Sequence, residues 1–188
     1  MNLTEFSCSY NICDDGGVEP QGLDQRQQAA WVRLASVLEL LPAALDTQLR
    51  RDSDLIHFEY FVLAMLSEAP KRTLRMSALA ALTSATAPRL SHVVKRLEDR
   101  GLVQRFPCPE DARATNASLT AAGWRKVRQA APGHLATVRY NVIDALSPQQ
   151  LGQLTDIADA ILGRLDPNGT MAGTYRRYDA EQPTTTDP

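Results

Sequence analysis

The chain has 188 residues, a length that suits one ordinary domain with extensions. Its 44% hydrophobic and 22% charged residues are typical of a globular protein in water. We find no apolar run near the roughly 20 residues of a membrane-spanning helix, and the N-terminus lacks the pattern of a secretory signal. We therefore expect a cytoplasmic protein that makes no contact with a membrane.

The net charge of −2 conceals an uneven distribution along the chain. Residues 71–128 hold 12 of the 20 basic residues but only four of the 22 acidic ones. A basic module on an acidic scaffold is typical of proteins that bind nucleic acid. This distribution predicts double-stranded DNA as the partner, with chance clustering in a helical protein as the alternative.

Residues that could carry chemistry are few and scattered. The cysteines are Cys8, Cys13 and Cys108. They are too few for a disulfide framework, and no histidine stands at zinc-ligand spacing from them. The histidines are His57, His92 and His134. They fall on separate expected elements, without a catalytic-triad or phosphate-loop pattern. We therefore expect no metal, no cofactor and no catalysis.

The first third of the chain predicts an arm and two helices. Residues 1–22 are polar and predict a flexible arm. From Leu23 to about Arg51 apolar residues recur at helical spacing, and Pro42 should kink or break that helix. A second helix is expected after Ser53 as N-cap, with an end before Pro70.

The basic segment predicts a reading helix followed by a hairpin. A short helix over 74–83 and a polar gap lead to a helix that begins after Thr86 and ends at Gly101. Four apolar residues recur on one of its faces and should be buried: Leu90, Val93, Val94 and Leu97. The segments 102–106 and 114–119 alternate like strands, and the loop 107–113 contains two prolines and should project. This order predicts a winged helix-turn-helix over 71–119, which would form the DNA-binding lobe.

The last third predicts two further helices. Thr120 should open a helix interrupted near Pro132, and Ser147 with Gln150 is a strong start for a final helix up to Leu165. Residues 166–188 are polar and predict a disordered tail. The fold class is therefore mainly α, a winged helix-turn-helix with a small β-hairpin wing. Helices over 23–70 and 120–165 would form a dimerisation region, since the last helix carries an apolar stripe that needs a partner.

Three motifs in order resemble the MarR family of bacterial regulators. They are LSHVVKRLEDRGLVQR at 90–105, PEDAR at 109–113 and LTAAG at 119–123. The resemblance covers roughly residues 24–165. It implies an obligate dimer in which the first and last two helices of each subunit interlock. It also implies repression, less often activation, of genes usually near its own, with relief by a small aromatic or lipophilic ligand or by oxidation.

The outer face of the basic helix holds the candidate base-reading residues. We expect Arg89 and His92 to reach base edges, and Lys95 and Arg96 to lie on phosphates. A merely solvated helix face is the alternative. Ser84 and Thr86 at the helix entrance suit phosphate oxygens, although Thr86 could serve only as a cap.

The hairpin supplies the remaining candidate DNA contacts. The resemblance makes Arg113 the wing-tip arginine, whose guanidinium suits a narrow A·T-rich minor groove. Asp111 could hold it in place, and a surface ion pair of little value is the alternative. Arg105 should lie near phosphate or pair with Asp111.

Regulatory sites are predicted less sharply. Trp31, His57 and Tyr60 are candidates for a pocket that takes a small aromatic or phenolic ligand, with plain core packing as the alternative. Cys108, near two wing arginines, is the candidate for a redox switch. A winged-helix protein-interaction module without DNA binding and a cysteine-based redox-sensing regulator are the alternative functions.

Overall fold

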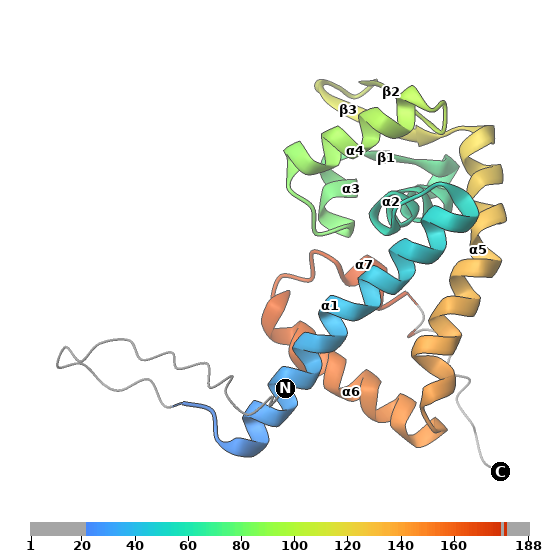
Figure 1. The fold of residues 1–188 in the computed structure, drawn as a ribbon. Coiled ribbons are helices and arrows are strands. Elements are labelled where there is room, and N and C mark those ends of the chain that lie inside the picture. Colours follow the sequence, from blue (N-terminus) through green and yellow to red (C-terminus); the bar gives the residue numbers. More distant parts are fainter. Residues whose placement is uncertain (1–21, 178, 180–188) are drawn as a thin grey trace, which may run out of the picture. The chain divides into compact units, whose positions relative to one another are not determined.

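The computed structural model describes residues 22–177 and 179, shown in Figure 1. The chain divides into two compact units, one up to Val37 and one from Leu38 onward. In the first unit the described residues lead into a helix, and every other element belongs to the second. The expected N-terminal arm, together with Cys8 and Cys13, lies outside the described residues apart from its last position.

Two helices open the described part of the chain. Helix α1 runs from Gln25 to Ser53 and continues through Pro42, so the expected break does not occur. Helix α2 spans His57–Glu68. Ser53 is the last residue of α1, and the N-cap position of α2 belongs to Ile56. The Glu59 carboxylate accepts a hydrogen bond from the Ile56 N–H at 3.0 Å. The cap of α2 therefore comes from inside the helix.

Among the described residues, α1 is the single helix whose length and apolar character would allow it to cross a membrane. Its most apolar 18-residue window has a mean hydropathy of 1.2, and 6% of that window is buried. Helices of water-soluble proteins that pack against other protein meet the same two criteria. The finding therefore carries no argument for a membrane location.

The middle of the chain forms the winged helix-turn-helix, and the predicted fold class is correct. A 3₁₀ turn, η1 (Pro70–Arg72), and a short strand, β1 (Thr73–Arg75), precede α3 (Met76–Leu82). The recognition-type helix α4 spans Ala87–Asp99 and is followed by Gly101 with φ of 69°. That left-handed backbone is one that glycine adopts without strain. Strand β1 was not predicted, since three residues are too few to show an alternating pattern.

The wing is longer and tighter than predicted. Strands β2 (Val103–Cys108) and β3 (Asp111–Leu119) leave only Pro109 and Glu110 between them, where the sequence predicted a loop over 107–113. The sheet is antiparallel with the order β1-β3-β2, so β2 is an edge strand. Pro107 is tolerated because an edge strand can lack an N–H, and the pairing shifts register between Pro107 and Cys108.

Two long helices follow the wing. Helix α5 (Ala121–Asn141) runs uninterrupted through Pro132 and leads through η2 (Ile143–Ala145) to α6 (Pro148–Leu165). The predicted capping box is confirmed, with the Ser147 hydroxyl accepting from the Gln150 N–H and the Gln150 side chain accepting from the Ser147 N–H. A last short helix, α7 (Ala172–Tyr175), packs near α3. The predicted disordered tail is therefore wrong for residues 166–177.

One continuous apolar core holds most of the helices and the sheet together. It joins the end of α1 to α2, α3, α4, the sheet and α5 through side chains with almost no exposed surface. Its fully buried members include Leu49, Leu63, Leu79, Val94 and Leu97. Helix α6 contributes no buried residue. The second unit therefore consists of a packed lobe and a helix, α6, that the described residues leave without a buried side chain.

Candidate nucleic-acid interface

Helix α4 has the two faces that its periodicity predicts. Leu90, Val93, Val94 and Leu97 are buried, and the four predicted reading residues are exposed. These are Arg89, His92, Lys95 and Arg96. The burial fixes the rotation of the helix, so its polar face is turned to solvent along its whole length.

Two of these cations are already paired within the fold. Arg96 donates to Glu59 of α2, whose carboxylate is 2% exposed and also receives Arg100 at 3.5 Å. Lys95 lies 3.1 Å from Asp99, and both side chains are about 60% exposed. An exposed pair can open readily, whereas a buried carboxylate resists losing its partner. Arg96 therefore serves first to fix α4 on α2. Of these two paired cations, only Lys95 is readily available to another partner.

The N-terminal half of α4 offers the freer groups. The Arg89 guanidinium lies over the Phe58 ring at 4.2 Å, which positions its stem without using its five donors. His92 is exposed one turn further along. Thr86 is the N-cap by position, but its hydroxyl makes no capping hydrogen bond, and Ser84 before it has φ of 47°. Both hydroxyls therefore stand exposed at the helix entrance, free of the capping role that was the alternative for Thr86.

Arg105 couples the wing to α4 and does not pair with Asp111, which corrects one predicted option. Its Nε and Nη2 donate to Glu98 Oε2 at 2.9 and 2.6 Å, and its backbone N–H donates to Glu98 Oε1. The Arg105 hydrogen bonds lower the pKa of the Glu98 carboxyl. This paired arginine holds strand β2 against the end of α4.

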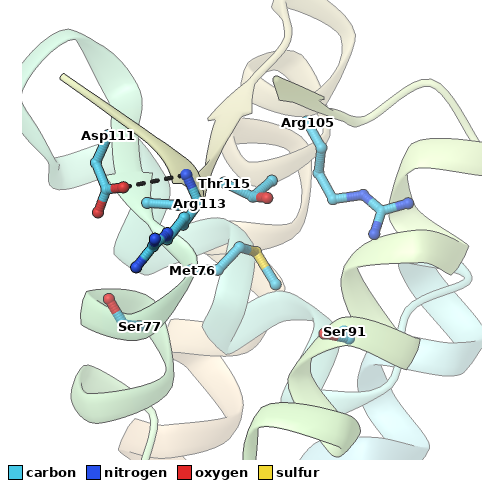
Figure 2. Close-up of a pocket in the computed structure, with 8 residues that line it drawn as sticks. Met76, Ser77, Ser91, Arg105, Asp111, Arg113 and Thr115 are labelled. Atoms are coloured by element: carbon cyan, nitrogen blue, oxygen red, sulfur yellow. Dashed lines mark hydrogen bonds between the residues drawn. The ribbon is translucent and has the colours of Figure 1, made fainter. Parts of the chain in front are cut away.

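Arg113 lies on strand β3 with its guanidinium open. Asp111 accepts the backbone N–H of Arg113 at 3.0 Å, so it orders the hairpin and does not clamp the charged group. Among residues 22–177 and 179, no carboxylate pairs with the guanidinium of Arg113. Figure 2 shows Arg113 and Asp111 on one side of a hollow, with Arg105 and Ser91 on the other. This hollow of about 410 Å³ lies between the wing and the helices α3 and α4.

Cys108 is less accessible than a redox switch requires. It ends strand β2 with 5% of its surface exposed. The neighbouring Cys108 is the largest cause of a raised pKa for Arg75, which also lies 3.1 Å from Glu110. Cys108, the candidate for a redox switch, is buried because the longer strand carries it into the sheet.

Two of the three predicted ligand residues meet across a histidine that the sequence reasoning did not single out. His134 of α5 stacks on His57 at 5.9 Å and lies 4.5 Å from the Tyr60 ring. Burial lowers the pKa of both histidines and raises that of Tyr60. Trp31 belongs to the first unit and is 54% exposed.

Two polar atoms beside this aromatic group lack partners. Within the described part of the chain, Gln48 Oε1 and His134 Nδ1 are buried without a hydrogen bond. Gly133 brings α5 close to α1, since a Cβ there would lie 2.8 Å from Gln48 Nε2. A group of three or more His, Cys, Asp or Glu side chains that could hold a metal is absent from the described residues.

The comparisons with known proteins agree with this architecture. The family model described as MarR family matches residues 57–115. Sco3205 of Streptomyces coelicolor, a MarR family transcriptional regulator solved in complex with DNA, is 40% identical with a TM-score of 0.77. The match covers 81% of this chain and 95% of Sco3205. The chain belongs to the MarR family.

Two further comparisons bear on how far this likeness extends. AbsC, another MarR family transcriptional regulator of Streptomyces coelicolor, is 36% identical with a TM-score of 0.74, over 77% of this chain and 97% of AbsC. MepR of S. aureus, solved with DNA, is 20% identical with a TM-score of 0.64 over 72% and 96% of the two chains, and shows the fold alone. No curated protein matches the chain.

In this MarR-family chain, sequence reasoning predicted which polar side chains of α4 are exposed but missed the residues that pair with them. Glu59 and His134 contact partners from distant parts of the sequence, and Glu98 contacts Arg105 on the strand that follows its helix. The spacing of α2 offered one usable signal, since Glu59 stands at the third helical position, where a capping carboxylate is common. Nothing local marked His134.

Proposed function

We propose that the chain is a transcriptional regulator that binds duplex DNA as a homodimer and represses genes near its own. Helix α4 would enter the major groove, and the β2–β3 wing would reach the adjoining backbone or minor groove. The observation that carries this proposal is the open guanidinium of Arg113 on the wing, beside the exposed polar face of α4. The DNA complex of Sco3205, at 40% identity, supports the same reading.

The charges divide into those that hold the lobe together and those left for a ligand. Arg96, Arg100 and Arg105 are engaged by Glu59 and Glu98. Arg89, His92 and Arg113 keep their polar atoms available, as do the hydroxyls of Ser84 and Thr86. A surface with fixed internal pairs and free outer donors suits a phosphate backbone with base edges behind it.

A homodimer would cover the apolar side chains that α6 leaves exposed. Leu154, Ile157 and Leu165 are 42%, 58% and 75% exposed, on a helix without a buried residue. Single chains rarely leave such a stripe in water. Sedimentation at micromolar concentration should give a dimer, and a monomer there would contradict this part of the proposal.

The DNA-binding proposal is tested by fluorescence anisotropy on a duplex selected from a random library by the full chain. Several cations across two lobes would displace counterions, so log affinity should fall linearly with log salt with a slope of several units. Saturable binding with such a slope supports the proposal. A flat response, or no selected duplex, favours the alternative of a protein-interaction module.

A small aromatic ligand, such as a phenolic acid, would release the regulator from DNA by binding beside His57, Tyr60 and His134. The stacked rings and the unpartnered Gln48 Oε1 and His134 Nδ1 support this assignment. A panel of phenolic acids added to the preformed DNA complex should include one that lowers the anisotropy. The His134→Ala variant should lose that response and keep its DNA affinity, and an unchanged response would place the site elsewhere.

A further inference from the structure

The chain after α6 folds back onto the helix-turn-helix. Asp166 accepts the N–H groups of Thr170 and Met171 at 2.7 and 2.8 Å, and the Tyr175 hydroxyl at 3.3 Å. Gly169, with φ of 64°, completes the reversal. These bonds give the segment Asp166–Arg177 a fixed shape, so α7 is held at a set distance from the end of α6.

Helix α7 then completes the end of α3. Leu82 is the last residue of α3, where carbonyl groups lack partners within the helix. The Thr174 hydroxyl donates to the Leu82 carbonyl oxygen at 3.1 Å and lies 3.7 Å from Met65 Sδ. Gly173 allows the close approach, since a Cβ there would already touch Leu82. A residue from the far end of the chain thus caps the helix that precedes the turn into α4.

The segment also reaches α2, and it spans a space that α6 does not fill. Arg177 forms an ion pair with Glu68 at the end of α2. A hollow of about 560 Å³ separates the turn at Ser84–Thr86 from Leu162 and Leu165 of α6. Helix α6 itself therefore does not support the turn. The contacts of Thr174 and Arg177 connect the segment that follows α6 to α3 and α2.

We propose that the segment Asp166–Arg177 sets the position of the helix-turn-helix relative to α6, with Thr174 as the positioning residue. This inference rests on the proposed function. If α6 lies in the dimer interface, the distance between the two reading helices depends on how each lobe is held to its own α6. The segment would then determine which half-site spacing the dimer prefers, without touching DNA.

The test compares Thr174→Val with Thr155→Val. Both threonine hydroxyls donate to a carbonyl oxygen, but Thr155 bonds to Leu151 within α6. Each full-length variant is titrated against a duplex with one half-site and against full operators with one base pair added or removed between half-sites. One added base pair moves a half-site by about 3.4 Å along the DNA axis. The operator is the one selected by the wild-type chain.

Wild type and Thr155→Val should prefer one spacing clearly. Thr174→Val should keep its affinity for the single half-site within about twofold. The ratio of its affinities for the preferred spacing and for the other spacings should fall by at least about threefold. Thr174→Ser, which keeps the hydroxyl, should restore the preference.

An unchanged spacing profile in a folded Thr174→Val variant would overturn the inference. An equal loss of affinity at every spacing and at the half-site would also overturn it, because Thr174 would then only support the lobe. Failure of the wild type to select any duplex would instead refute the proposed function, and this inference with it.

Discussion

Arg96 on α4 donates to Glu59 on α2, a carboxylate 37 positions earlier in the sequence and 2% exposed. Glu59 also receives Arg100 and accepts the Ile56 N–H that opens α2. One buried side chain therefore caps its own helix and fixes the helix proposed to read DNA. The pair joins α4 to α2.

Replacing Glu59 by Gln should destabilise the protein. The amide keeps the shape but loses the charge that two guanidinium groups share, at a cost of about 1–3 kcal/mol in the free energy of unfolding. The control is Asp99→Asn, which breaks the exposed pair with Lys95 and should cost less than about 0.5 kcal/mol. Urea denaturation of both variants measures the difference. Equal costs would show that Glu59 is no better coupled than a surface group.

Arg113→Ala should weaken DNA binding and leave folding intact. Its side chain is exposed, so thermal stability should change by less than about 0.5 kcal/mol. The loss of a minor-groove charge should cost about 1–3 kcal/mol of binding per subunit. Arg89→Ala is the comparison, and should relax base preference in the major groove. Anisotropy titrations at one salt concentration measure both, and wild-type affinity in Arg113→Ala would refute the wing assignment.

Gly123→Ala should destabilise the chain, although alanine favours a helix. A Cβ at Gly123 would lie 2.1 Å from the Leu102 carbonyl oxygen, a backbone atom that cannot turn aside. The overpacking should cost about 1–3 kcal/mol. Gly152→Ala on α6 meets nothing within 4 Å in the chain and should stabilise by up to about 1 kcal/mol. Thermal melts of the pair should therefore shift in opposite directions, and a shift of the same sign would contradict the close contact.

Stability should fall as the pH is lowered through the range in which histidine titrates. Burial lowers the pKa of His57 and His134 in the folded chain, the charge of His57 lowers that of His134 further, and Asp46 opposes the shift at His57. Below about pH 6.5 the unfolded chain therefore binds more protons than the folded one, and protonation favours unfolding. Melting temperatures recorded from about pH 8 to 5.5 should drop, and less so in the double variant His57→Asn, His134→Asn.

The control for this pH effect is His92→Asn, on the exposed face of α4. It should follow the wild-type pH dependence. A double variant that retains the full drop would show that the stacked pair is not its source.

Periodicity predicted what depends on local sequence. The burial of Leu90, Val93, Val94 and Leu97 follows from their spacing alone, and the exposure of Arg89 and His92 follows from theirs. The capping box at Ser147 needs only neighbours three residues apart. These features were predicted correctly because each is decided within one or two helical turns.

Contacts between different helices and strands decided the rest. Sequence could not show that Arg96 faces Glu59, that Arg105 faces Glu98, or that His134 stacks on His57. It predicted breaks at Pro42 and Pro132, whereas both helices continue through those residues. It also missed α7, because a polar stretch gives no hint that Thr174 completes the end of α3.

The edges of the small sheet have a consequence for the protein at high concentration. A free strand edge invites another copy to add a strand, which starts aggregation. Here one edge, β1, is three residues long, and the other, β2, carries Pro107 and a register shift. Neither edge offers a long regular row of N–H and C=O groups. The wing can therefore stay exposed and ready for its ligand without recruiting the wings of other molecules into a shared sheet.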